Sequence, residues 1–192
     1  MSVGGVAVFP ADTVYGLACD PDSRDAVERL YTLKRRRPDR PAAVMFFDLE
    51  LALAALPELG PETTRAVSAL LPGGVTLLLA NPEGRFPLAG GGETLGLRVP
   101  ALEGALAPLA AIRWPVLQSS ANRTGGPDAR RLDEVPGPIR AGADLVLDAG
   151  ELPGTPSTVV DLRGYERDGS WSIVREGAVP AADLEARLAQ RP

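Results

Sequence analysis

The sequence predicts one domain of mixed α/β or α+β class, built on a mixed β-sheet with flanking helices over residues 1–192. Short β-like runs alternate with amphipathic helical stretches, and several strands follow one another with no helix between them. The length of 192 residues suits one generous domain. The 45% of hydrophobic and 23% of charged residues are typical of a folded globular chain, and no internal repeat interrupts the pattern.

Capping residues and hydrophobic periodicity place the elements of the first half of the chain. Ser23 is a typical helix N-cap, and one face of the helix after it carries four residues: Val27, Leu30, Tyr31 and Lys34. The expected elements are a strand at 6–9 that Pro10 stops, a helix at 24–35, a loop at 36–41, a strand at 42–47, helices at 49–56 and 61–71 that begin after Asp48 and Gly60, a turn at 72–74 and a strand at 75–80.

The second half is predicted from the same signals, with glycine and proline marking the loops. Residues 81–93 read as a loop, and the glycines at 90–92 read as a flexible hairpin tip, because no strand–helix context surrounds them. The other expected elements are strands at 94–99, 116–118, 145–147, 158–162 and 171–174, and helices at 102–112, 132–141 and 180–189.

Composition excludes several kinds of chemistry. The chain has no histidine, which removes Ser-His-Asp and Cys-His relays and every histidine zinc site. Its one cysteine, Cys19, excludes an intramolecular disulfide and fits a reducing compartment. Of the 20 basic residues only Lys34 is a lysine.

Charge and hydropathy limit the possible partners. A net charge of −5 argues against nucleic acid covering the whole surface, but it leaves room for a local basic groove. No apolar run is long enough to span a membrane, and residues 1–5 lack the features of a signal peptide. We therefore expect a cytoplasmic protein with no membrane contact.

Polar segments at strand ends are the candidate functional sites, because open α/β sheets bind ligands there. Segment 10–17 offers the hydroxyls of Thr13 and Tyr15, although a plain turn explains it equally well. Segment 34–41 holds five positive charges in eight positions, offset only by Asp39. This favours phosphate binding, with a solvated loop or a nucleic-acid contact as alternatives. No Walker motif accompanies it, which excludes a P-loop NTPase.

Two further segments carry weaker signals. Segment 118–126 is rich in small hydroxyl and amide residues, which favours an anion- or adenine-binding loop. Residues 156–158 and Arg175 flank strands and are unremarkable by themselves. Four acidic residues near the N-terminus match no calcium loop and are interpreted as a solvated acidic face: Asp12, Asp20, Asp22 and Asp25.

Taken together and in this order, these segments resemble the YrdC-like family of threonylcarbamoyl-AMP synthases. Residues 10–17 are similar to its Pro-Thr-Asp/Glu-Thr-Val-Tyr-Gly-Leu signature, and Lys34-x-Arg36 with Arg40-Pro41 is similar to its basic segment. The other similar motifs are Pro-Gly-x-x-Thr-Leu at 72–77, Val-Arg-x-Pro at 97–100, Ser-Ala-Asn-x-Ser-Gly at 120–125, Ser-Thr at 157–158 and Val-Arg-x-Gly-Ala at 174–178.

The resemblance implies a short, single-domain form of this family, with a twisted mixed sheet around a deep, positively lined groove. It also implies synthesis of L-threonylcarbamoyl-adenylate from L-threonine, bicarbonate or CO2 and ATP with Mg2+, and the release of pyrophosphate. That product would serve the t6A modification of tRNA through threonylcarbamoyl-transfer proteins, with at most weak direct contact to RNA or tRNA.

The resemblance also implies roles for individual residues. The threonine side would be formed by Thr13, Tyr15, Arg98, Gln118 and Ser157. The ATP side would be formed by Lys34, Arg36, Arg40, Thr94, Ser120, Asn122, Asp128 and Arg175, with Lys34 and Arg36 as the catalytic cations. No protein ligand for a metal is assigned.

Both the residues and the resemblance indicate a reaction that depends on fixed positive charge rather than on a strong base. The sequence departs from the family at Ala11, at Gln118 and at Met45, which stands where some members place a histidine beside threonine. Two alternatives remain open at this point: another carbamoyl-adenylate-forming enzyme of the same fold, and an RNA-binding module of the same fold without this activity.

Overall fold

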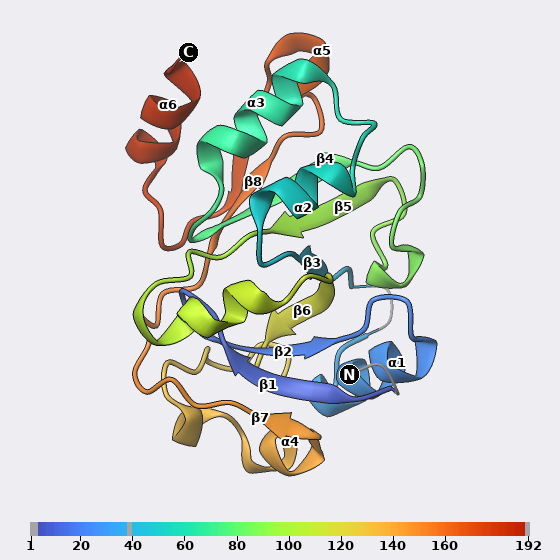
Figure 1. Cartoon of the computed structure of the whole chain (residues 1–192), viewed down its shortest axis with the longest axis vertical. Helices are drawn as coiled ribbons and strands as arrows, with labels where there is room; N and C mark the ends of the chain where they lie inside the picture. Colours follow the sequence, from blue (N-terminus) through green and yellow to red (C-terminus); the bar gives the residue numbers. More distant parts are fainter. Residues whose placement is uncertain (1–3, 38–39, 191–192) are drawn as a thin grey trace.

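The computed structural model describes residues 4–37 and 40–190, and these residues form one large mixed sheet (Figure 1). Its strands lie in the order β7-β1-β2-β6-β3-β5-β4-β8-β9. They are β1 (Val6–Pro10), β2 (Tyr15–Cys19), β3 (Ala43–Met45), β4 (Val75–Ala80), β5 (Thr94–Arg98), β6 (Val116–Ser120), β7 (Leu145–Val146), β8 (Thr158–Asp161) and β9 (Ser172–Arg175). The pairs β1–β7, β3–β5 and β4–β8 are parallel and the others are antiparallel, so the predicted mixed fold class is confirmed.

The helices cover the sheet in two groups (Figure 1). Helices α3, α5 and α6 pack together at the end that contains β4 and β8, while α1 and α4 pack on β1 and on each other at the opposite end. The helices are α1 (Arg24–Lys34), α2 (Leu49–Ala54), α3 (Pro61–Leu70), α4 (Gly137–Gly142), α5 (Tyr165–Asp168) and α6 (Ala181–Ala189), with 3-10 turns η1 (Pro87–Ala89), η2 (Gly104–Ala111) and η3 (Leu132–Glu134).

Local signals predicted the start and the buried face of α1 correctly. The Ser23 side chain accepts a hydrogen bond from the Ala26 N–H, which satisfies one of the free donors of the first turn. The four residues expected on one face are all buried: Val27, Leu30, Tyr31 and Lys34. Asp48 caps α2 in the same way through the Leu51 N–H.

The strand β2 was missed, because the 10–17 segment was interpreted as a loop. Pro10 does not stop β1; it is the last residue of that strand and pairs with Tyr15 across a hairpin. All five residues of β2 are buried, since the strand lies inside the sheet and is covered on both faces. Such a strand lacks the alternation of polar and apolar residues by which a half-exposed strand is recognised.

Two expected helices have a different form. Residues 102–112 contain the 3-10 turn η2 instead of an α-helix, because Pro108 lacks an N–H donor and Gly104 has a left-handed φ of 54°. Residues 132–141 are divided into η3 and α4 at Pro136. Among the described residues, no helix combines the length and the apolar character needed to cross a membrane.

Apolar side chains fill both faces of the sheet. A large cluster under the helices includes Tyr15, Leu17 and Cys19 of β2, while a smaller cluster on the other face includes Phe9 and Met45. Burial, reinforced by the charge of Asp20, raises the pKa of Cys19 to about 12. The thiol is therefore a packing group rather than a nucleophile.

The short helix α5, which was not predicted, provides the cap of α3. Gly60 stands at the N-cap of α3 and has no side chain to satisfy the first turn, and Glu166 Oε2 accepts the Thr63 N–H at 2.8 Å. A Cβ atom at Gly60 would lie 2.1 Å from the Glu166 carboxyl carbon, so the glycine leaves room for this carboxylate. The contact fastens α5 to α3.

Glu166→Ala removes this cap, and we expect the free energy of unfolding to fall by about 1 kcal/mol, as for other lost N-caps. Glu166→Gln keeps an acceptor oxygen and should lose less. Urea unfolding measures both, with Glu185→Ala on the exposed face of α6 as the control. Equal stability of Glu166→Ala and Glu185→Ala would contradict the capping role.

Candidate functional site

A cavity of about 570 Å³ lies among strands of the sheet and the loops that follow β6 and precede β8. Strands β3, β4, β5, β6, β8 and β9 all contribute to its wall. Eight of the residues expected to bind substrate line it: Arg36, Thr94, Arg98, Gln118, Ser120, Asp128, Ser157 and Arg175. Five expected residues are not among its lining residues: Thr13, Tyr15, Lys34, Arg40 and Asn122.

The charge of the cavity is opposite in sign to that of the whole chain. Of its described lining residues, Arg36, Arg98 and Arg175 are basic and Asp128 alone is acidic, whereas the whole chain carries a net charge of −5. Guanidinium groups in such a concave site attract phosphate and carboxylate groups. The volume lies within the range of about 300–1,000 Å³ that small-molecule sites occupy.

Arg98 is held in the cavity wall by the segment between β1 and β2. Its Nη2 donates to the Asp12 carboxylate and, at 2.7 Å, to Thr13 Oγ1. Asp12 also accepts the Ala101 N–H at 3.0 Å. The interpretation of Asp12 as part of a solvated acidic face was therefore wrong, because its carboxylate is the buried partner of an arginine. Thr13 contacts this arginine but is not itself among the lining residues of the cavity.

One donor of Arg98 remains without an acceptor. Arg98 is only 3% exposed, and its buried Nε has no hydrogen-bond partner among the described residues. Buried donors are nearly always paired in proteins, because an unpaired one costs free energy. An acceptor supplied by a ligand would satisfy it.

Ser157 and Arg175 form another part of the wall, where β8 lies between β4 and β9. Ser157 Oγ lies 2.8 Å from Thr76 Oγ1, and Arg175 Nη2 donates to the Ser157 carbonyl at 2.7 Å. A Cβ atom at Gly177 would lie 2.3 Å from the Pro156 carbonyl, so only glycine allows the chain after β9 to approach. Thr76 was not predicted as a site residue, although the motif at 72–77 contains it.

Lys34, the last residue of α1, lies behind the loop that follows β6. Its ammonium group donates to the Ser120 carbonyl, to the Asn122 carbonyl at 2.8 Å and to Asn122 Oδ1 at 3.0 Å. Asn122 in turn donates to Asp128 Oδ1 at 3.0 Å and to the Gly126 carbonyl at 2.7 Å. These bonds set the shape of the loop that carries Ser120 and Asp128 to the cavity.

All three N–H bonds of the Lys34 ammonium are used within the protein. The side chain is 1% exposed, and burial lowers its pKa to about 8, with a further lowering from Arg36 and an opposing effect from Asp128. In the structure Lys34 therefore holds the loop that follows β6. A residue that binds phosphate directly needs a free donor, and the Lys34 ammonium has none.

Arg36 is the member of the basic segment that reaches the cavity. Its Nε donates to the Arg40 carbonyl at 3.3 Å, its Nη2 donates to the Pro41 carbonyl, and its guanidinium lies 5.8 Å from the centre of the Tyr31 ring. These partners are neutral, so they orient the positive charge without cancelling it. Arg40 contributes its carbonyl here, while its side chain is exposed. Residues 38–39 of the basic segment lie outside the described residues.

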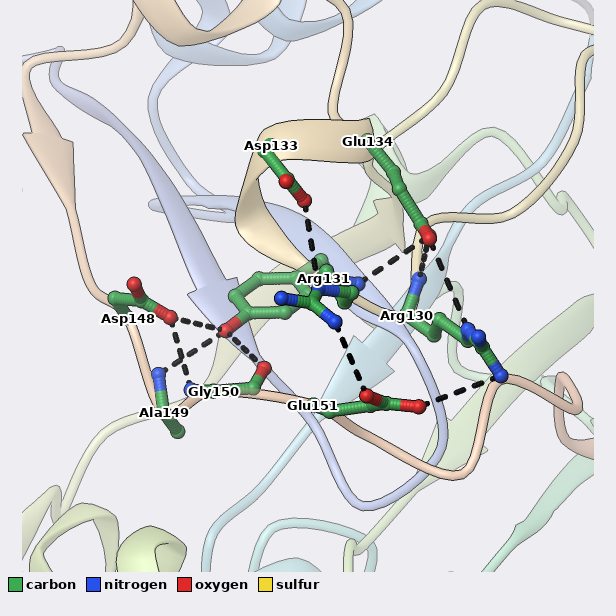
Figure 2. Close-up of polar contacts among 9 residues, drawn as sticks. Arg130, Arg131, Asp133, Glu134, Asp148, Ala149, Gly150 and Glu151 are labelled. Carbon is green, nitrogen blue, oxygen red and sulfur yellow. Dashed lines mark hydrogen bonds and ion pairs between the residues drawn. The ribbon is translucent and has the colours of Figure 1, made fainter.

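Tyr15 belongs to the large apolar cluster, on the face of the sheet opposite Phe9 and Met45. Its hydroxyl lies 2.7 Å from Asp148 Oδ1 and 2.9 Å from the Gly150 carbonyl, and it accepts the Ala149 N–H at 3.0 Å (Figure 2). Burial is the main cause of its raised pKa. Tyr15 therefore fastens the segment that leads from β7 towards Ser157 and does not border the cavity.

Around this hydroxyl, exposed ion pairs tie the same segment to the turn η3 (Figure 2). Arg130 and Arg131 contact the Glu151 carboxylate at 3.4 Å and 3.3 Å.

Gly16 of β2 leaves room for the Gln118 side chain at the cavity wall. A Cβ atom at Gly16 would lie only 3.0 Å from Gln118 Nε2, so a larger residue would push this amide aside.

Met45 does not border the cavity either. It is fully buried in the smaller apolar cluster with Phe9 and Phe47.

Among the described residues, no group of three or more histidine, cysteine or acidic side chains could hold a metal ion. Asp128 is the only carboxylate in the described lining of the cavity.

The chain matches the Sua5/yciO/yrdC family, which is described as "Telomere recombination", over residues 1–177. A threonylcarbamoyl-AMP synthase of Pyrococcus abyssi is 29% identical over 95% of this chain and 53% of its own length. One of Alkalilimnicola ehrlichii is 36% identical over 80% of each chain. The crystal structure of P. abyssi Sua5 complexed with L-threonine has a TM-score of 0.79 and 28% identity over 97% of this chain and 54% of that one. The chain thus spans about half the length of its P. abyssi relative.

The Lys34 contacts predict a stability effect. Lys34→Met keeps an unbranched side chain of similar length but removes the ammonium donor from the Ser120 carbonyl, the Asn122 carbonyl and Asn122 Oδ1, of which, within the described residues, only Oδ1 keeps another donor, the Ser120 hydroxyl. We therefore expect the free energy of unfolding at pH 7 to fall by about 2–3 kcal/mol. Urea unfolding measures the difference.

The lowered pKa of Lys34 predicts a dependence of this difference on pH. The pKa of Lys34 is about 8 in the folded protein and 10.5 in the ordinary case, so the unfolded chain binds more protons between these pH values. The stability of the wild type relative to Lys34→Met should therefore rise from pH 8 to 10.5, and a constant difference would contradict the lowered pKa.

Proposed function

Because the chain belongs to the Sua5/yciO/yrdC family, we propose that it makes L-threonylcarbamoyl-adenylate from L-threonine, bicarbonate or CO2 and ATP, with release of pyrophosphate. Relatives that are 29% and 36% identical carry the name threonylcarbamoyl-AMP synthase, and the P. abyssi Sua5 structure holds L-threonine. The product would be passed to threonylcarbamoyl-transfer proteins for the t6A modification of tRNA, in the cytoplasm.

The observation that carries this proposal is the convergence of separate motifs on one cavity. Arg36 follows α1, Arg98 ends β5, Ser120 ends β6 and Arg175 ends β9, yet all four line the same space. A non-enzymatic RNA-binding module would need its cations spread over an open face with aromatic residues between them. Cations gathered inside a cavity favour a small anionic substrate.

The amino acid is assigned to the part of the cavity around Arg98. The unpartnered Nε of Arg98 is a donor suited to a carboxylate, and Ser157 offers a hydroxyl group to the same cavity. Thr13 would act through Arg98, because its hydroxyl accepts a hydrogen bond from Arg98 Nη2. Gln118 offers an amide beside Gly16. These groups suit a small amino acid that bears both a carboxylate and a hydroxyl.

The nucleotide is assigned to the part that contains Arg36, Thr94, Ser120 and Arg175, with Asp128 at the same end. Arg36 and Arg175 are oriented by backbone carbonyls, so their charges are in place before the substrate binds. Mg2+ bound to ATP would neutralise further phosphate charge. Lys34 and Asn122 would act on this end by holding the loop of Ser120 and Asp128.

The proposed chemistry needs positioning more than proton transfer. The threonine amine attacks CO2 and loses a proton to form a carbamate. A carbamate oxygen then attacks the α-phosphorus of ATP, and the bond to the β-phosphate oxygen breaks to release pyrophosphate. Negative charge gathers on phosphate oxygens during this step, and fixed guanidinium groups such as those of Arg36 and Arg175 stabilise it.

The reaction itself is the first test. Purified protein with L-threonine, bicarbonate, ATP and Mg2+ should release pyrophosphate and form threonylcarbamoyl-adenylate, detected by mass spectrometry. Omission of threonine should abolish both signals. Equal turnover without an amino acid, or with carbamoyl phosphate in place of threonine and bicarbonate, would instead identify another carbamoyl-adenylate-forming enzyme of this fold.

Substitutions at the two ends of the cavity should affect different substrates, which the KM values for threonine and for ATP would show. Arg98→Lys loses the fork that pairs with Asp12 and Thr13, so the KM for threonine should rise roughly 10- to 100-fold, the effect of a lost charged hydrogen bond. Arg175→Ala should mainly raise the KM for ATP. Arg131→Ala, outside the cavity, is the control. Equal effects of Arg98→Lys on both KM values would contradict the assignment.

A further inference from the structure

A second cavity, of about 500 Å³, lies beside α1 and shares Arg36 and Gly90 with the first. Its other lining residues come from α1, from the residue after it and from the turn η1. Tyr31 and Val27, which are 6% and 8% exposed, and the half-buried Leu88 supply its apolar surface. The two cavities are therefore neighbours with a common wall.

Positive charge surrounds this second cavity. Arg24, Arg35 and Arg36 line it, and Glu28 is the only acidic residue in its described lining. Within residues 4–37 and 40–190, the side chains of Arg24 and Arg35 have no carboxylate partner, and Arg36 donates to neutral carbonyls. Three guanidinium groups with one carboxylate suit a polyanion, because each guanidinium can bind two phosphate oxygens.

The backbone at Arg35 is an independent sign that this cavity has a use. Arg35 ends α1 in the left-handed conformation, with φ 49° and ψ 41°, a position that glycine usually fills. The helix end is otherwise regular, since the Arg35 N–H donates to the Thr32 carbonyl at 3.0 Å. Strained backbone of this kind concentrates at functional sites, where the side chain justifies the strain. Here the side chain is a guanidinium at the rim of the second cavity.

We infer that the second cavity binds pyrophosphate, the leaving group of the proposed reaction, as it departs from the first. The inference rests on the proposed function, which supplies this ligand. Arg36 lines both cavities and can contact the departing phosphates on either side. Gly90, which lines both cavities, has a left-handed φ of 80° and no side chain between them. Arg24 and Arg35 would complete the site.

Arg35→Gly is the decisive variant, because it removes the guanidinium and gives the backbone its preferred residue. Its melting temperature should be equal to or higher than that of the wild type. The inhibition constant of added pyrophosphate should rise at least fivefold, while the KM for ATP stays within twofold. Arg24→Ala should shift inhibition in the same direction. Arg131→Ala, which removes an exposed arginine outside both cavities, should leave inhibition unchanged.

Calorimetric titration of inorganic pyrophosphate into the free protein provides a readout that needs no turnover. Arg35→Gly should weaken this binding at least fivefold. If Arg35→Gly and Arg24→Ala bind pyrophosphate as the wild type does while the complete reaction proceeds, the inference is overturned and the proposed function stands. If no pyrophosphate is released from the substrates but titration still depends on Arg35, the proposed function fails and the anion site stands. Loss of RNA oligonucleotide binding alone in Arg35→Gly would overturn the inference in favour of a nucleic-acid contact.

Discussion

The end of the cavity to which we assign the nucleotide depends on one buried ammonium group, that of Lys34. Lys34 closes α1 and binds the carbonyls of the loop after β6, and through Asn122 its influence reaches Asp128. The helix α1, the interior strand β6 and the cavity wall are thereby linked at a single point. Burying a charge is costly unless its hydrogen bonds are complete, and here they are complete. Removal of the charge would take this donor from the Ser120 and Asn122 carbonyls.

The arginines of the cavity illustrate two ways to hold a cation. Arg98 is fixed by a carboxylate, Asp12, which balances its charge and leaves Nε as the donor for a ligand. Arg36 and Arg175 are fixed by neutral carbonyls, which preserve their charge. For the proposed reaction this division is useful, since a neutral amino-acid zwitterion needs orientation while a triphosphate needs net positive charge.

The sequence predicted the structural features that depend on neighbouring residues, and it missed those that depend on contacts between residues far apart in the chain. The Ser23 cap and the buried face of α1 are local features and were confirmed. The strand β2 was missed because burial on both faces hides its periodicity. The resemblance named eight of the residues that line the cavity. The pairing of Asp12 with Arg98 and the direction of Tyr15 towards Asp148 could not be predicted, because they depend on contacts between segments far apart in the chain.

The sheet order also has a consequence for how the protein is made. The contacts Asp12–Arg98 and Thr76–Ser157 join residues 86 and 81 positions apart, and β1 pairs with β7 near residue 145. Such non-local pairing slows folding, because long loops must close before their contacts form. On the ribosome, β1 and β2 emerge long before their sheet neighbours β7 and β6. The complete cavity therefore forms late on the nascent chain, only after Arg175 of β9 has been synthesised.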